Sequence, residues 1–129
     1  MTDRGNSKSI YVTIVEKIKD DIVCGKLMEE QRLPSVRDYA VQLQVNPNTV
    51  MRAYDKLYDE EIIYIKRGIG YFVAKGAVDS VLASMRLRFF HEDMPEMFRQ
   101  LRMLGVSPQE LKSDYAAWLE ENEEKQEKH

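Results

Sequence analysis

The feature that most restricts the fold of this chain is a sharply marked helix start close behind another helix. Asn46 is a strong N-cap residue, and Pro47 suits the first helical position because its missing N–H would have no partner there. The apolar residues that follow recur at helical spacing: Val50, Ala53, Tyr54 and Leu57. The sequence therefore predicts a helix with a fixed start at residue 47.

A second helix is predicted directly upstream, over residues 36–43. Pro34 favours an extended backbone at Leu33. Ser35 is suited to cap the first turn, and Asp38 places a favourable charge in that turn. Only about three residues then separate the two predicted helices, which is the connection of a helix-turn-helix.

The flanking segments add the remaining elements of a winged helix-turn-helix. An earlier amphipathic helix, with Gly25 as its C-terminal cap, is predicted from apolar residues at helical spacing: Tyr11, Ile14, Val15, Ile18 and Ile22. After Glu61, two β-rich runs, residues 62–65 and 71–73, surround the turn Lys66-Arg67-Gly68-Ile69-Gly70. Two such runs around a glycine-containing turn predict a hairpin.

From Val78 onward the pattern is helical again, in three apolar stripes. The stripes are Val78, Val81 or Leu82, Met85 and Phe89; Met97, Phe98, Leu101 and Leu104; and Leu111, Tyr115, Trp118 and Leu119. Breaks are predicted near Asp93-Met94-Pro95 and at Gly105-Val106-Ser107-Pro108. About 50 residues in short helices are too few for a large core of their own. The stripes therefore need a partner, either the winged domain or a second copy of the chain.

Composition and charge are those of a folded globular protein. Apolar residues make up 43% and charged residues 32% of the chain. Residues 1–76 carry 12 Lys and Arg against 11 Asp and Glu, and residues 77–129 carry 7 against 11. The acidic excess behind the net charge of -3 thus lies in the C-terminal part. Its tail, EENEEKQEKH, is expected to be a solvated, fraying helix end.

Two expectations concern the cell compartment and the cysteine. The longest apolar runs are only a few residues, so neither a signal peptide nor a membrane span is predicted, and the protein is expected to be cytoplasmic. The one cysteine, Cys24, falls in an apolar helical pattern and is expected to be a buried small hydrophobe.

The start of the helix at residue 47 has the chemistry of a DNA-binding surface. A helix N-terminus offers unpaired N–H groups and a partial positive charge, and Asn48 and Thr49 lie there without an apolar role. Arg52 is long enough to reach a base edge or a phosphate, and Lys56 continues the same face. The alternative is that Asn48 and Thr49 only help to cap the helix, and that Arg52 and Lys56 form an ordinary solvated face.

Two other elements supply further candidates, and their convergence favours DNA. Arg37 is placed in the first turn of the helix over residues 36–43 to touch the DNA backbone. The wing tip offers the cations Lys66 and Arg67, while Gly68 permits close approach to the sugar-phosphate chain. A winged helix brings these residues to one face: Arg37, Asn46, Asn48, Thr49, Arg52, Lys66, Arg67 and Gly68.

At these residues the sequence resembles the N-terminal domain of the GntR family of bacterial transcription regulators. The segments LPSVRDYAVQLQVNPNTVMRAYDKL and IIYIKRGIGYFV, with the preceding helix, cover about residues 10–75. The wing GIGYFV and the short helical tail are similar to the YtrA subfamily. The resemblance implies DNA contacts at Ser35, Arg37, Asn46, Asn48, Thr49, Arg52, Gly68 and Gly70.

This chain departs from the family pattern at two places. Glu29-Glu30 stand where Pro-Gly commonly precedes the Leu-Pro-Ser segment, which is expected to affect a loop more than binding. Met51 occupies a position that is often Arg in other branches of the family. The base preferences of those branches therefore do not carry over.

The resemblance also implies a role for the tail, since it is too short for the effector-binding or enzyme-like domains of larger members. The expected fold is α+β, mainly α, with a winged DNA-binding domain at residues 1–76 and a short helical dimerisation unit at residues 77–129. The residues expected at the dimer interface are Leu82, Met85, Phe89, Met97, Phe98, Leu101 and Trp118. The alternative is that these residues cover the winged domain within one chain.

A two-fold dimer would present two recognition helices to major grooves about one turn apart. The operator is then expected to be an imperfect palindrome with half-sites on the order of 10 bp apart. By resemblance, the expected outcome is repression. The sequence leaves open whether a small-molecule effector binds between the winged domain and the tail, and no group of residues marks a pocket for it.

Other functional classes find little support in the sequence. No nucleophile motif or phosphate-cradling loop is present, so neither a catalytic site nor a cofactor is predicted. His91, Glu92 and Asp93 are adjacent on a predicted helix and point in different directions, so no metal site is predicted. The main alternative is a winged helix that binds another protein, which would expose apolar residues where this chain has Asn48, Thr49, Arg52 and Lys56.

Overall fold

The computed structural model describes the backbone of residues 2–127 and the side chains of residues 10–123. The chain divides into two compact units, Met1–Met85 and Arg86–His129, which we call the winged unit and the C-terminal unit. The predicted domain boundary after residue 76 stays a prediction. Residues 128–129 of the predicted fraying end lie outside the described residues.

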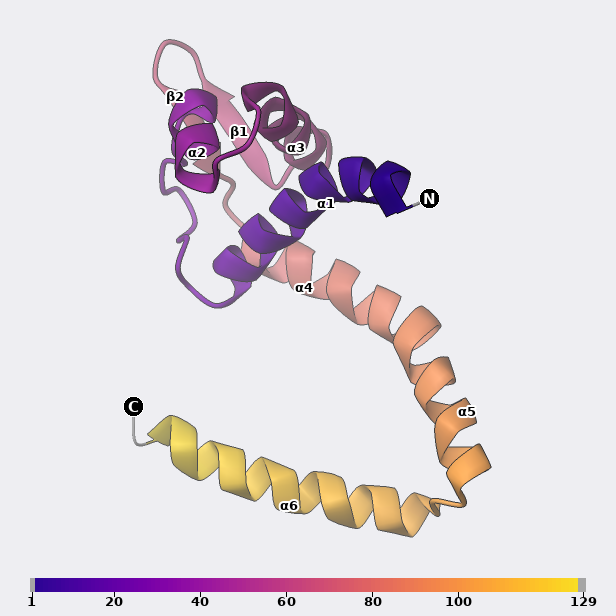
Figure 1. The fold of residues 1–129 in the computed structure, drawn as a ribbon. Helices are drawn as coiled ribbons and strands as arrows, with labels where there is room; N and C mark the ends of the chain where they lie inside the picture. The colour runs from indigo at the N-terminus through magenta and orange to yellow at the C-terminus, as the bar shows by residue number, and fades with distance from the viewer. Residues whose placement is uncertain (1, 128–129) are drawn as a thin grey trace. The chain divides into compact units, whose positions relative to one another are not determined.

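The winged unit has the predicted order of elements. Its helices are α1 (Thr2–Val23), α2 (Val36–Leu43) and α3 (Pro47–Asp59), followed by the antiparallel strands β1 (Ile63–Lys66) and β2 (Gly70–Val73). Figure 1 shows the hairpin turn projecting beyond the helices of this unit. The winged helix-turn-helix expected from the sequence is thereby confirmed.

The helix ends follow from the capping residues. The Ser35 hydroxyl accepts a hydrogen bond from the N–H of Asp38 at 3.0 Å, so α2 begins at residue 36 as predicted. The Asn46 side chain accepts from the N–H of Asn48 at 2.8 Å, with Pro47 in the first helical turn of α3. Gly25 follows α1 and has a φ of 89°, the left-handed conformation in which helices commonly end.

The core of the winged unit is built from the predicted stripes of α1 and α3 and from the hairpin. Its buried members include Ile14, Val15, Ile18, Ile22, Val50, Ala53, Tyr54, Leu57, Ile62, Ile63 and Val73. The first turns of α4 (Ala77–Arg88) add Ala77 and Val81 to the same core. Each fully buried aliphatic side chain contributes about 1.5–3 kcal/mol, so burial of this cluster is the main favourable term in the folding of the unit.

A third extended segment, which the sequence analysis missed, lies beside β2. The N–H of Glu30 donates to the carbonyl of Val73, the N–H of Val73 donates to Gln31, and the N–H of Leu33 donates to Tyr71, at 2.8–2.9 Å. Arg32 and Phe72 form the bridge pair between the two segments. Glu30 is a turn residue with a φ of 71°, and the rest of the segment at residues 30–33 lies as a short edge against the wing.

Glu29 and Glu30, the departure from the family pattern, both have structural partners. The Glu29 carboxylate accepts from the N–H of Gly76 at 2.8 Å and of Val78 at 3.1 Å, which caps the start of α4. These two hydrogen bonds hold the pKa of Glu29 below its ordinary value. Glu30 accepts a hydrogen bond from the Tyr64 hydroxyl of β1. This acidic pair thus ties the loop after α1 to α4 and to the wing.

One predicted break in the C-terminal part is wrong. Instead of ending near Asp93-Met94-Pro95, the helix continues from α4 through a π-helical turn, η1 (Phe89–Asp93), into α5 (Met94–Leu104). The N–H of Met94 donates to the carbonyl of Phe89, five residues back. Pro95 has no N–H and its ring crowds the preceding turn, and a widened turn placed just before it accommodates both effects without ending the helix.

The second predicted break is confirmed. Gly105, at a φ of 72°, ends α5, and the Ser107 hydroxyl accepts from the N–H of Glu110 at the start of α6 (Pro108–Glu127). Among the described side chains of η1, α5 and α6, none is buried. The apolar stripes of these helices are therefore not buried by the C-terminal unit itself.

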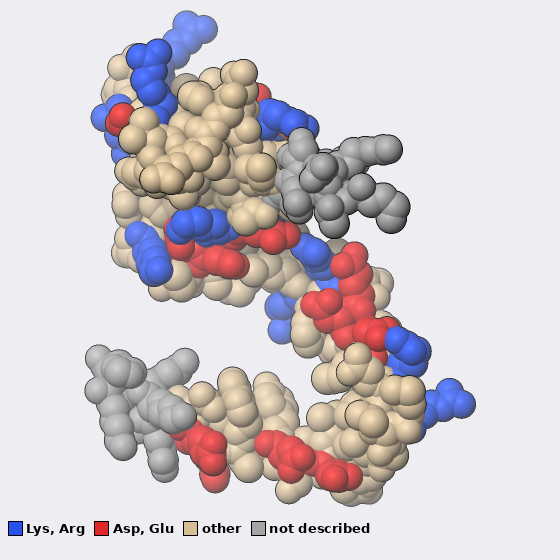
Figure 2. Space-filling view, in the orientation of Figure 1, with Lys and Arg blue, Asp and Glu red and all other residues tan. Residues whose placement is uncertain are grey.

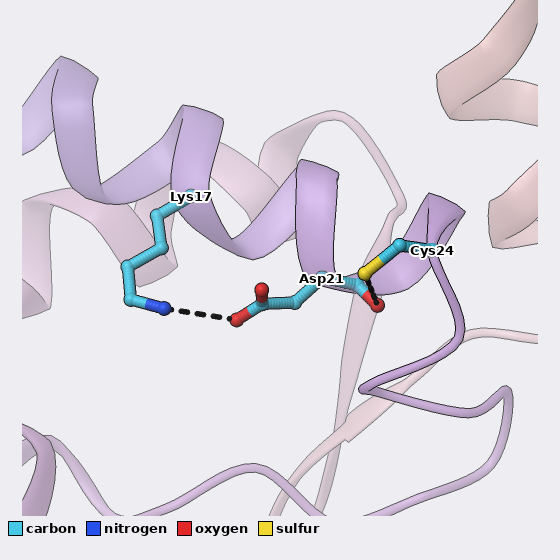
Figure 3. Close-up of polar contacts among 3 residues, drawn as sticks. All are labelled: Lys17, Asp21 and Cys24. Atoms are coloured by element: carbon cyan, nitrogen blue, oxygen red, sulfur yellow. Dashed lines mark hydrogen bonds and ion pairs between the residues drawn. The ribbon is translucent and has the colours of Figure 1, made fainter. Parts of the chain in front are cut away.

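The expectation for Cys24 is also wrong, because its side chain is exposed. Cys24 follows the last residue of α1 and lies two positions past the buried Ile22, so it does not share the buried stripe. Figure 3 shows its thiol against the Asp21 carbonyl at 3.6 Å, while Lys17 pairs with the Asp21 carboxylate at 3.2 Å.

No helix in the described part of the chain has the length and apolar content needed to span a membrane.

Candidate nucleic-acid interface

The N-terminus of α3 separates the residue that caps the helix from those left for a ligand. The Asn46 side chain accepts the capping hydrogen bond, and Asn48 contributes its backbone N–H. The Asn48 side chain is exposed and the Thr49 side chain is half-buried. The side chain that caps α3 is therefore that of Asn46 and not that of Asn48. The amide of Asn48 can face a base edge or a phosphate oxygen.

Arg52, one turn further along α3, has a partner that the sequence analysis did not foresee. Its guanidinium lies over the ring of Tyr11 from α1, 4.3 Å from the ring centroid. Such a contact restricts the arginine side chain while leaving its donors at the edge of the guanidinium plane available. Tyr11 lies on the predicted stripe of α1 but is only partly buried, and an aromatic residue at the exposed margin of such a stripe is the signal for this role.

Lys56 is less free than its exposure suggests. Its Nζ is 3.6 Å from the carboxylate of Glu60, which also accepts from Lys19 of α1 at 2.9 Å. The carboxylate therefore offsets part of the positive charge that Lys56 would bring to a phosphate. Compared with Arg52, Lys56 is the weaker candidate for a DNA contact.

The start of α2 is held against α3 by a buried tyrosine. The Tyr54 hydroxyl donates to the carbonyl of Pro34 at 2.7 Å, and burial raises the pKa of this hydroxyl. The Tyr54 ring also contacts Tyr71 of β2 edge-on, with centroids 5.0 Å apart. Ser35 uses its hydroxyl to cap α2, and Arg37 in the first turn is exposed. One side chain of α3 thus contacts both the residue before the cap of α2 and a ring of the wing.

The wing carries the remaining candidates. Lys66 and Gly70 form the last cross-strand pair, so the turn spans residues 67–69 and is shorter than predicted. The Lys66 ammonium lies over the Phe72 ring at 4.4 Å. Arg67 and Gly68 are exposed at the turn, where Gly68 has a φ of 75° that favours glycine.

All eleven residues predicted to contact DNA lie in the winged unit, and none is buried. Thr49 and Gly70 are half-buried, and the exposed nine are Ser35, Arg37, Asn46, Asn48, Arg52, Lys56, Lys66, Arg67 and Gly68. Figure 2 shows Lys and Arg side chains at the end of this unit that carries the hairpin turn and also lower on the unit, where Asp and Glu lie beside them. The unit is thus nearly neutral in sum, with exposed cations at the hairpin turn.

The described residues contain no group of three or more His, Cys, Asp or Glu side chains arranged to hold a metal ion. The available chemistry is that of amide, hydroxyl, guanidinium and ammonium donors on an exposed surface. These groups bind phosphate and base edges.

Comparison with known proteins identifies the family. The family model described as bacterial regulatory proteins, gntR family, matches residues 10–73. The HTH-type transcriptional regulator YhcF of Bacillus subtilis is 32% identical over 106 residues, which cover 82% of this chain and 86% of YhcF. The chain belongs to the gntR family of bacterial regulatory proteins. It is therefore a DNA-binding transcriptional regulator, and the family is not one of enzymes.

Two further matches indicate that the chain is similar to short members of the gntR family. The HTH-type transcriptional repressor YtrA of Bacillus subtilis is 29% identical over 119 residues, covering 92% of this chain and 88% of YtrA. A GntR-family protein from Bacteroides thetaiotaomicron has a crystal structure with a TM-score of 0.75 and 44% identity, covering 88% of this chain and 98% of that one. The matches to YhcF and YtrA span most of both proteins, which is consistent with the YtrA subfamily.

Proposed function

We propose that this gntR-family chain is a cytoplasmic repressor that binds a palindromic operator as a homodimer. One observation carries the proposal. The winged unit buries the apolar stripes of α1 and α3 and exposes polar and basic side chains at α2, α3 and the wing, whereas no described side chain of α5 or α6 is buried. The first unit is thus suited to DNA, and the second is suited to a copy of itself.

For the DNA half of the proposal, α3 is the recognition helix. Asn48 at its start reads a base edge, and an amide side chain is well matched to adenine. Arg52, held over Tyr11, reads guanine or a phosphate. Arg37 and Arg67 bind phosphates on either side of the groove. Operator affinity then falls with added salt, and the slope of log affinity against log salt concentration is set by the number of phosphates contacted.

For the dimer half, the support is exposed apolar surface. The large apolar side chains exposed on η1, α5 and α6 are Phe89, Phe90, Phe98, Met103, Leu104, Tyr115, Trp118 and Leu119. Apolar residues at helical spacing that their own unit does not bury are suited to a two-fold partner, which presents the same stripes in return. YtrA, which this chain matches over most of its length, is a repressor. A dimer across a promoter represses by blocking access to it.

The DNA half is tested by selecting bound sequences from randomised duplexes and then measuring affinity by fluorescence anisotropy in a salt series. We expect an imperfect palindrome with half-sites on the order of 10 bp apart. Asn48→Ala and Arg52→Ala should each weaken operator binding by about tenfold or more, because each loses a contact that distinguishes bases. Lys112→Ala, which removes an exposed cation from α6, is the matched control and should leave specificity unchanged.

Two results would count against the DNA half. Operator affinity that survives Arg52→Ala would remove Arg52 from the readout. Weak binding with no sequence preference by the wild-type protein would favour a winged helix that serves a protein partner.

The dimer half has a built-in probe, because Trp118 is the only tryptophan in the sequence and its side chain is 57% exposed in one chain. Association through α6 should shift its emission to shorter wavelength as protein concentration rises. Phe98→Glu should abolish this shift, because it places a charge in the apolar contact. Met28→Glu changes a similarly exposed apolar residue in the winged unit and should leave association intact. Equal effects of the two variants would contradict an interface built on the C-terminal unit.

A further inference from the structure

The wing is held by a residue outside the hairpin. Residues 30–33 run beside β2, and Arg32 pairs with Phe72. Alternate residues of a strand share a face, so Gly70 and Phe72 lie on the face opposite to the buried Val73. The Arg32 side chain follows that outer face toward the turn, where its Nη2 donates to the carbonyl of Ile69. The guanidinium thus bridges the edge segment and the wing tip.

The Arg32 guanidinium packs closely against the backbone at Gly70. A Cβ atom on Gly70 would lie 3.2 Å from Nε of Arg32, which is tighter than nine in ten real contacts of a Cβ, and 3.4 Å from Nη2. Its φ of 145° also favours glycine. The resemblance implied a DNA contact for Gly70, and the fold supplies an internal reason for glycine at this position.

Gly68, at the tip of the same turn, is the natural comparison. Its φ of 75° favours glycine as well, but a Cβ there would have no atom within 4 Å. The two wing glycines therefore share a backbone requirement and differ in one respect: Gly70 has Arg32 against it. Strain from contact with the Arg32 side chain should therefore arise on substitution of Gly70 and be absent on substitution of Gly68.

We propose that Arg32 is a positioning residue for operator binding, which fixes the wing tip so that Arg67 and Gly68 meet the DNA backbone. The proposal rests on the proposed operator binding by α3 and the wing. Arg32 donates a hydrogen bond to a carbonyl and also packs against Gly70, and the planar guanidinium can do both at once. A lysine ammonium has the same charge but no such plane. Arg32→Lys should therefore behave like Arg32→Ala, whereas a simple phosphate contact would be kept by lysine.

The first test uses the protein without DNA. In ¹⁵N relaxation of the full chain, the amides of Gly68 and Ile69 should become more mobile in Arg32→Ala, while the amide of Thr49 in α3 stays as rigid as in the wild type. Unchanged relaxation at Gly68 and Ile69 would overturn the proposal, whatever the protein does with DNA. Equal thermal unfolding of wild type and variant checks that the fold is intact.

The second test is a double-mutant cycle on operator affinity. Arg32→Ala and Arg32→Lys should each weaken binding by about tenfold, the equivalent of one hydrogen bond to a charged group. Gly70→Ala should weaken binding in the wild-type background and by clearly less when Arg32 is already alanine, because the two changes act through one contact. Asn48→Ala, in α3, should have the same effect in both backgrounds.

The outcomes separate the two proposals. If Gly70→Ala costs the same with and without Arg32, or if Arg32→Lys binds like wild type, the positioning role is overturned while operator binding stands. Failure of the proposed function shows differently: the wild-type protein selects no sequence, and Asn48→Ala changes nothing.

Discussion

The winged unit and the C-terminal unit carry apolar residues at the same helical spacing but use them in opposite ways. In the winged unit, the stripes of α1 and α3 meet the hairpin in a core where Leu57 and Val50 are 0% exposed. In the C-terminal unit, Leu104 is 71% exposed and Phe98 48% exposed. The difference shows that periodicity predicts an apolar face without saying what covers it. The winged unit covers its own stripes, and we propose that a second copy covers those of the C-terminal unit.

The largest effect should come from a matched pair of leucines, one in each unit. Leu57→Ala should lower the free energy of unfolding by about 2–5 kcal/mol, since it empties a site in a packed core. Leu104→Ala should change it by no more than about 0.5 kcal/mol. Urea unfolding followed by circular dichroism measures both, each in a Phe98→Glu background so that association does not contribute. A large loss for Leu104→Ala would break the comparison, because the C-terminal unit would then have a core of its own.

The next test places the border between the two behaviours inside α4. Val81 is 0% exposed and Leu82, its neighbour, 39% exposed. Val81→Ala should cost about 2 kcal/mol at every protein concentration, because it removes methyl groups from the core of the winged unit. Leu82→Ala should lower stability only at concentrations where chains associate. Thermal unfolding at two well-separated concentrations distinguishes these cases, and the same concentration dependence for both variants would contradict the assignment.

A smaller effect is expected from the hydroxyl that joins α3 to the start of α2. Tyr54→Phe leaves the Pro34 carbonyl without its hydrogen bond and should cost about 1 kcal/mol of unfolding free energy. Tyr115→Phe, in α6, is the control and should be neutral because this side chain is mostly exposed. Equal effects from the two changes would mean that the Tyr54 hydroxyl adds nothing to the core of the winged unit.

The smallest effect should be the pH dependence from Glu29. The hydrogen bonds from Gly76 and Val78 lower the pKa of this carboxyl from its ordinary value of 4.5. Its contribution is then fully present above that ordinary value and is lost as pH falls through the lower folded value. Urea unfolding of Glu29→Gln should therefore show a shallower loss of stability below pH 4.5 than the wild type. The same pH dependence in Glu29→Gln and wild type would contradict a contribution from these two hydrogen bonds.

What the sequence predicted well depends on neighbouring residues. Ser35, Asn46 and Ser107 cap helices through bonds to residues two or three positions away, so α2, α3 and α6 begin where their caps indicate. Cys24 was mispredicted for an equally local reason, because the helix ends before it. The break expected at Pro95 is absent because a π-helical turn accommodates the proline.

What the sequence missed depends on residues far apart in the chain. The edge segment at residues 30–33 has no alternating pattern of its own and gains its strand character by pairing with β2. Arg32 with Ile69 and Tyr11 with Arg52 are contacts across about 40 positions, so local periodicity carries no sign of them. The roles of Asn48 and Arg52 as base contacts, and of the C-terminal stripes as an interface, remain predictions.

The most direct measurement is sedimentation of the protein on its selected palindromic duplex, which gives the number of chains in the complex. We expect two 15.1 kDa chains on one duplex, and we expect Phe98→Glu to lose this complex at protein concentrations where the wild type binds fully. One wild-type chain per duplex, together with equal operator affinity in wild type and Phe98→Glu, would show that the C-terminal unit does not pair two winged units on DNA.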